Sequence, residues 1–159
     1  MAQVSELSAR EVGLASTGPA TPAWVTRLVW MAVAIGALSV LLLARWLEPD
    51  PRGFGTHEQL GLPPCGFAQL TGLLCPSCGL TTAFAYMARG FLTPALEAHA
   101  LGPLLFALTC ASIPFASVAS ARAWPISVTL QRLRAPALAV IIAGTALVYW
   151  VVRSIVSTL

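Results

Sequence analysis

The sequence has few charged residues and no lysine. Only 9% of its 159 residues are charged, and all nine cations are arginines, whereas an ordinary soluble domain is about 25% charged. Hydrophobic residues make up 57% of the chain, and the mean hydropathy is +0.80. A water-soluble fold of this size needs more charge to cover its surface. The composition therefore indicates an integral membrane protein.

A strongly basic patch is also missing. The net charge of +3 is spread along the ends of apolar runs, which does not favour nucleic-acid binding. The expected partners are the lipid bilayer and other membrane protein subunits. A small-solute channel or transporter is less favoured, because such proteins usually carry charges within the membrane.

Three apolar runs are each long enough to cross a bilayer. They cover residues 28–44, 104–121 and 136–152, each ends at an arginine, and tryptophans flank the first. The first run is too long for a signal peptide, and no small-x-small cleavage site follows it before Arg45-Trp46, so we expect a transmembrane helix here. The sequence predicts an all-α integral membrane protein with three transmembrane helices, at about 26–47, 103–121 and 136–156.

The remaining segments define the domain organisation. Residues 1–23 are small and polar with two Pro-containing breaks, and they predict a flexible N-terminal tail. Residues 24–157 form a single membrane domain, with a Cys-containing loop at 48–102. Its prolines and glycines argue against one continuous helix. We expect it to fold onto the membrane interface with short interfacial helices, one at 80–89, capped by Thr81 or Thr82.

Small residues recur every four positions in all three predicted spans. Such ridges let helix backbones approach closely. They predict a compact three-helix bundle capped by the Cys loop. The ridge residues are Ala32 and Gly36, then Ser112, Ala116 and Ser120, then Ala135, Ala139 and Ala143.

The arginines suggest an orientation. Five precede the first span or lie between the second and third, against four on the other side, and cytoplasmic segments carry the excess. The prediction is a multi-pass protein of the bacterial inner membrane, with a cytoplasmic N-terminus and a periplasmic Cys loop. The two sets are Arg10, Arg27, Arg122, Arg132 and Arg134, against Arg45, Arg52, Arg89 and Arg153.

The chemistry of the chain is concentrated in Cys75-Pro76-Ser77-Cys78-Gly79. Pro76 fixes its own φ and Gly79 permits a left-handed residue, so the turn can direct both sulfurs to one point. Cys65 lies ten residues upstream and supplies a third thiol.

One interpretation of these thiols is a metal site. Tetrahedral Zn²⁺ takes four Cys or His ligands, and a Cys-x-x-Cys turn supplies two of them. Cys65 would be the third ligand, and His57 (or His99) would complete the set. The possible cofactor is therefore Zn.

Two alternatives remain open. Cys75 and Cys78 precede a predicted helix whose dipole would stabilise a thiolate, as in a thiol–disulfide oxidoreductase, with Cys65 as a further redox thiol. However, no thioredoxin-like βαβ pattern and no evident quinone or flavin site accompanies them. Alternatively, the thiols form a structural disulfide or thiol cluster that pins the loop, as an extracytoplasmic location favours. Cys110, within an apolar run, is interpreted as a packing residue.

These residues resemble a bacterial membrane family catalogued as domain of unknown function 2752. The resemblance covers roughly residues 53–105 and rests on the Cys-Pro-x-Cys-Gly-x-Thr motif that ends at Thr81, on Ala88-Arg89-Gly90, on Leu101-Gly102 and on the run Cys65–Gly72. The chain has Thr82 where the family usually carries Arg, and His99-Ala100 where it carries Asn-Pro. The resemblance implies a membrane location and the Cys loop as the defining feature, and implies no reaction.

Taken together, the sequence predicts a small non-enzymatic integral membrane protein. We expect an accessory subunit of a membrane assembly, whose Cys/His loop binds a structural metal or is pinned by a disulfide. The alternative is a membrane thiol–disulfide oxidoreductase that uses Cys75 and Cys78.

Overall fold

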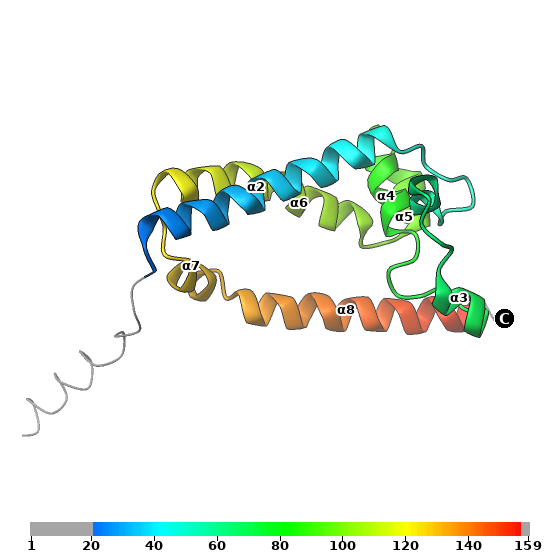
Figure 1. Ribbon diagram of the computed structural model, residues 1–159. Helices are drawn as coiled ribbons and strands as arrows, with labels where there is room; N and C mark the ends of the chain where they lie inside the picture. The colour runs from blue at the N-terminus through cyan, green and yellow to red at the C-terminus, as the bar shows by residue number, and fades with distance from the viewer. Residues whose placement is uncertain (1–20, 157–159) are drawn as a thin grey trace, which may run out of the picture.

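The protein is all-helical over the residues that the computed structural model describes, 21–156 (Figure 1). The predicted tail 1–23 thus lies, except for its last three residues, outside the described residues. The elements in chain order are α2 (Ala23–Trp46), the 3-10 helix η1 (Thr56–Leu60), α3 (Gly66–Thr71), α4 (Leu80–Met87), α5 (Leu92–Ala98), α6 (Gly102–Ala121), α7 (Ile126–Arg132) and α8 (Ala135–Val156).

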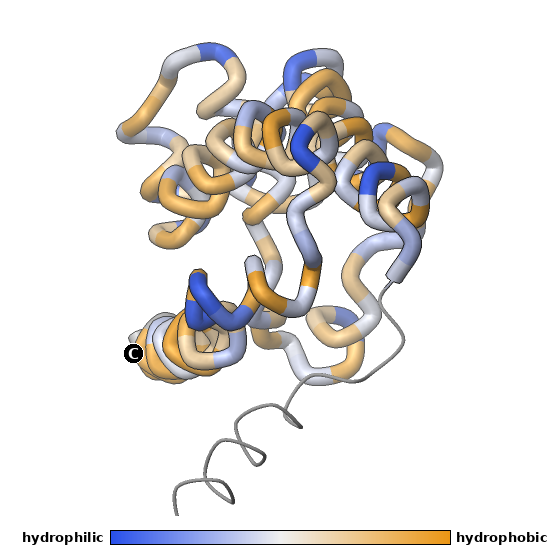
Figure 2. Tube along the Cα trace, turned by 90° about the vertical axis from the view of Figure 1, so that its left-hand side faces the viewer, coloured by the Kyte–Doolittle hydropathy of each residue, from blue (hydrophilic) through white to orange (hydrophobic). Residues whose placement is uncertain are grey.

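Three of these helices, α2, α6 and α8, are long and apolar enough to cross a membrane. They coincide with the three predicted spans to within a few residues, so the predicted fold class is confirmed. Large hydrophobic side chains are exposed along all three helices, and the orange of hydrophobic residues recurs along the helical trace in Figure 2. Such surfaces are suited to contact with lipid rather than water.

Helices α2 and α6 form the packed core of the spans. Trp30 of α2 lies against Ala116 and Ala119, which are both fully buried. The indole Nε1 of Trp30 also donates a 2.9 Å hydrogen bond to the carbonyl of Trp124, just after α6. Small residues on α6 therefore admit a large side chain from α2, and the indole nitrogen is satisfied at the helix end.

Helix α8 stands apart from the α2–α6 pair, as both Figure 1 and Figure 2 show. None of its most apolar eighteen-residue window is buried. The ridge residues Ala139 and Ala143 are exposed, so the prediction of a compact three-helix bundle is wrong for this helix. Its attachments lie at its two ends: α7 precedes and contacts its start, and its far end meets the Cys loop. A small-residue ridge permits close packing but does not select a partner.

The short helices α4 and α5 close the end of the α2–α6 pair that carries the Cys loop. Ala83, Ala95 and Ala98 form a buried cluster between them. A Cβ on Gly102, at the start of α6, would collide with the Cβ of Ala83. The absence of side-chain volume at these positions thus lets α4, α5 and α6 approach closely, and it fixes the start of α4 next to the Cys turn.

Candidate metal centre

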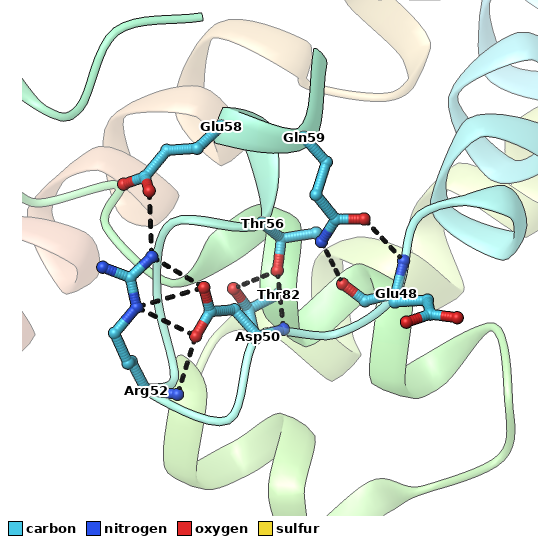
Figure 3. A network of polar contacts seen from close by, with 7 residues as sticks. All are labelled: Glu48, Asp50, Arg52, Thr56, Glu58, Gln59 and Thr82. Atoms are coloured by element: carbon cyan, nitrogen blue, oxygen red, sulfur yellow. Dashed lines mark hydrogen bonds and ion pairs between the residues drawn. The ribbon is translucent and has the colours of Figure 1, made fainter. Parts of the chain in front are cut away.

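The loop after α2 is held by an acidic and basic network at the molecule's surface (Figure 3). Arg52 Nη2 lies 2.7 Å from Asp50 Oδ2 and 2.9 Å from Glu58 Oε2. Hydrogen bonds from Arg52 lower the pKa of the Asp50 carboxyl, and the hydrogen bonds to Asp50 and Glu58 raise the pKa of Arg52. Gln59 exchanges two hydrogen bonds with the backbone of Glu48. These contacts order residues 48–60 beside the cysteines.

A buried pair of hydroxyls joins this loop to α4. Thr56 Oγ1 and Thr82 Oγ1 lie 2.7 Å apart, and both side chains are fully buried. Thr56 Oγ1 also accepts a 3.0 Å hydrogen bond from the backbone N–H of Asp50. Thr82 therefore serves as a tertiary contact. The predicted capping by Thr81 or Thr82 is wrong, because the N-cap position of α4 is Gly79 and no side chain caps it.

The Cys75–Gly79 turn is compact, as the sequence predicts. The backbone N–H of Cys78 donates to the carbonyl of Cys75 at 3.0 Å, and Gly79 has a φ of 92°. A Cβ on Gly79 would collide with the carbonyl oxygen of Ala98 and lie 2.8 Å from that of Gly53. Only glycine satisfies both the left-handed backbone and this close approach.

Three cysteine sulfurs converge at this turn. The Sγ atoms of Cys65, Cys75 and Cys78 all lie within 4.8 Å of one another. Cys65 comes from the N-cap position of α3, and the other two from the turn before α4. The Sγ atoms of Cys75 and Cys78 are 3.0 Å apart, a hydrogen-bond distance that is longer than the ~2.05 Å of a covalent disulfide.

The two thiols of the turn differ in acidity. Burial alone would raise the pKa of Cys75, but hydrogen bonds from Cys78, Ser77 and Cys65 outweigh it and lower the pKa to about 7. Burial raises the pKa of Cys78, and hydrogen bonds with Cys75 and Cys65 raise it further, to about 12. The first proton thus leaves Cys75, and the neighbouring thiols stabilise the thiolate.

The two histidines lie in different places around the cluster. His57 lines the same cavity as the three cysteines, a space of about 540 Å³, but it is not part of the group of converging ligand atoms. His99 is buried, and its Nε2 lies 3.0 Å from the carbonyl oxygen of Pro76. His57 thus faces the space in front of the sulfurs, whereas His99 contacts the backbone of the turn.

The end of α8 also contacts the Cys loop. Trp150 Nε1 donates a 2.8 Å hydrogen bond to the carbonyl of Leu74, and the Trp150 ring packs edge-on against Phe67 of α3 at 6.1 Å. The ring of Tyr149 lies 5.3 Å from that of His99. Side chains of α8 and His99 thus hold both carbonyls that flank Cys75.

This donor set fits a thiophilic metal ion. Thiolates are the ligands that Zn²⁺ and other soft ions prefer, and Zn–S bonds of about 2.3 Å in a tetrahedron place sulfurs about 3.8 Å apart. The three Sγ atoms lie within 4.8 Å of one another, close to this separation. The 3.0 Å distance between the Sγ atoms of Cys75 and Cys78 would increase by several tenths of an ångström when the ion binds. A fourth ligand would enter from the cavity side.

The remaining candidates lie outside the cluster. Cys110 is exposed on the surface of α6. The prediction that it is a packing residue is therefore wrong. The Arg89 guanidinium donates to the carbonyls of Ala44 and Ala85, tying α4 to the end of α2. Trp150 and the Thr56–Thr82 pair were not singled out as site residues from the sequence, because they act through backbone and tertiary contacts.

Fold and site together define an all-helical membrane protein with a three-cysteine cluster at one end of its spans. Residues 65–113 match the sequence profile of a family described as "Protein of unknown function (DUF2752)". The resemblance read from the sequence is thus confirmed over the segment from Cys65 through α5 into α6. No curated protein and no solved structure matches the chain.

Proposed function

We propose that Cys65, Cys75 and Cys78 bind a structural Zn²⁺-like ion, and that the protein is a non-enzymatic accessory subunit of a bacterial inner-membrane assembly. One observation carries the metal proposal: three sulfurs from two separate segments converge within 4.8 Å. His57 is the favoured fourth ligand, because it lines the cavity that the sulfurs face. The ion would join α3 to the start of α4.

The subunit role is supported by the exposed apolar surface of α8. This helix packs against neither α2 nor α6 through its length, so a neighbouring protein has a full helix face available. The proposed orientation, with a cytoplasmic N-terminus and a periplasmic loop, is supported by the arginine distribution. In this orientation, alkaline phosphatase fused to the C-terminus should be active. An inactive C-terminal fusion together with an active fusion at the α6–α7 link would contradict the orientation.

Metal content of the purified full-length protein tests the proposal. We expect about one Zn²⁺ per chain in the wild type. The variants Cys65→Ser, Cys75→Ser and Cys78→Ser should lose it. Cys110→Ser is the matched control, because Cys110 is exposed on α6 and distant in sequence from the cluster. A metal-free wild type, or full retention in the Cys75→Ser variant, would overturn the proposal.

The fourth ligand is tested separately. His57→Ala should weaken Zn²⁺ retention under chelator, whereas His99→Ala should leave the ion in place and alter the stability of the turn. If His99→Ala releases the metal and His57→Ala does not, then the ligand assignment is reversed.

A second candidate is a thiol–disulfide oxidoreductase, which the 3.0 Å approach of Cys75 and Cys78 favours. The Cys75 thiolate would attack a substrate disulfide and release one thiol. Cys78 would then attack the Cys75 sulfur, release the second thiol and leave a Cys75–Cys78 disulfide. A dithiol reductant would reduce this disulfide back to two thiols and become a disulfide itself. Metal-free protein whose Cys75 and Cys78 cycle between thiol and disulfide would favour this function.

A further inference from the structure

Arginines gather at the end of the molecule opposite the Cys loop, and no acidic residue of the described range 21–156 lies at that end. Within residues 21–156, all four acidic residues lie in or beside the Cys loop: Glu48, Asp50, Glu58 and Glu97. The opposite end carries four exposed arginines, Arg27, Arg122, Arg132 and Arg134. None of these forms an ion pair with a described carboxylate. This end therefore presents a positive charge that the described part of the chain does not neutralise.

An apolar cavity of about 320 Å³ opens at this end of the molecule, with Arg132 among its lining residues. It lies between the end of α6, the turn that follows and α7. Arg132 is its only charged lining residue, and the apolar lining includes Phe115, Trp124 and Leu133. Its volume is within the range of small-molecule sites, about 300–1,000 Å³.

The walls of this cavity are well fixed. The Phe115 and Trp124 rings pack edge-on at 5.9 Å, and the carbonyl of Trp124 is bound by the Trp30 indole. The Arg122 guanidinium lies 5.9 Å from the centroid of the Trp124 ring. Thr129, also a lining residue, is buried and bonded to the carbonyl of Pro125.

The cavity lies where the spans end. Its lining residues run from Phe115 in the last third of α6 to Leu133, two residues before α8, and tryptophan is enriched at membrane interfaces. If the ends of these spans lie at the membrane interface, a ligand in the cavity would meet lipid headgroups on one side and acyl chains on the other. Apolar walls with a cation at the rim fit an amphiphile that has an anionic head.

We propose that this cavity binds one anionic phospholipid. Arg132 binds the phosphate, because guanidinium matches phosphate oxygens in a bidentate geometry. Arg122, whose guanidinium lies beside the Trp124 ring, and Arg134, two residues after Arg132, add positive charge nearby. The upper part of an acyl chain lies against Phe115, Val128 and Leu133. Basic pockets between spanning helices commonly recognise anionic headgroups. The site is independent of the cysteine cluster.

Native mass spectrometry of the full-length protein in detergent tests the site. Phosphatidylglycerol and phosphatidylcholine with identical acyl chains are titrated separately, and the first phosphatidylglycerol should bind more tightly. Arg132→Gln should weaken that first binding about fivefold, as one lost interfacial arginine implies. Arg45→Gln removes an exposed arginine at the other end of α2 and should leave the first phosphatidylglycerol binding unchanged.

A second variant separates the cavity from its charge. Val128→Trp keeps every arginine and fills part of the cavity, so it should weaken phosphatidylglycerol binding while the protein elutes as the wild type does in gel filtration. Equal binding of the two lipids would overturn the proposal, as would equal effects of Arg132→Gln and Arg45→Gln. Displacement of phosphatidylglycerol by inorganic phosphate would identify free phosphate as the ligand and overturn the assignment to lipid.

Discussion

The indole of Trp150, near the end of α8, donates a 2.8 Å hydrogen bond to the carbonyl of Leu74, the residue before Cys75. These residues are 76 positions apart. The contact fixes the peptide that leads into the Cys turn, and the carbonyl of Pro76 on the other side is held by His99. The position of Cys75 thus depends on the last span as well as on its own loop.

Trp150→Phe is the first prediction. It keeps an aromatic ring against Phe67 and removes the hydrogen bond to Leu74. We expect the unfolding free energy in detergent to fall by about 1 kcal/mol. If the cluster binds Zn²⁺, the affinity should fall about tenfold, because the turn that carries Cys75 is less well oriented. Trp46→Phe, at a highly exposed position of α2, is the control, and an equal effect there would contradict the role of Trp150.

The second prediction compares two glycines that both have a positive φ, Gly79 at 92° and Gly72 at 72°. An added Cβ meets backbone oxygens at Gly79, and at Gly72 it meets nothing within 4 Å. Gly72→Ala should cost about 1–2 kcal/mol for the left-handed backbone alone. Gly79→Ala should cost about 3–4 kcal/mol, since overpacking is added. Similar unfolding midpoints for the two variants would refute the close approach at Gly79.

The third prediction concerns the acidity of Cys75 in metal-free protein. Because its pKa is lowered to about 7, alkylation of Cys75 should rise with pH with a midpoint near 7: slow below it, where the thiol is protonated, and at a plateau above it. In the Cys78→Ala variant, which lacks one hydrogen bond to the thiolate, the midpoint should move up toward the ordinary value. Mass spectrometry of tryptic peptides after timed alkylation measures both. An unchanged midpoint in Cys78→Ala would show that Cys78 does not stabilise the thiolate.

The fourth prediction concerns the buried hydroxyl pair. Thr82→Val removes one hydrogen bond of Thr56 and should cost about 1 kcal/mol. Thr56→Val also leaves the N–H of Asp50 without its Thr56 acceptor, so it should cost more, about 2–3 kcal/mol. A double-mutant cycle of unfolding free energies gives the coupling. Additive effects would mean that the 2.7 Å contact between the hydroxyls contributes nothing to stability.

The sequence predicted the elements whose signals are local. Apolar runs between arginines gave the three spans, and the Pro76 and Gly79 pattern gave the Cys turn. Cys65 was also expected as the third thiol at that turn, because it lies only ten residues upstream. These features depend on residues close together in the chain.

Contacts between distant residues were not predictable in the same way. The ridge at Ala139 and Ala143 looks like those of the other spans, yet α8 packs on neither of them. Nothing in the sequence near Trp150 indicates that its indole reaches Leu74. This contact depends on the length of α8 and on where the chain enters α8 after α7. The roles of Thr56 and Thr82 depend likewise on how the loop folds over α4.

The separation of α8 from α2 and α6 has a mechanical consequence. Helix α8 contacts the rest of the protein at its two ends and is exposed along its middle, so no packed neighbour within the described chain holds its tilt. A change of membrane thickness can be accommodated by tilting of such a helix. A tilt of α8 would act on the Trp150–Leu74 hydrogen bond, and so on the peptide that leads into the Cys turn.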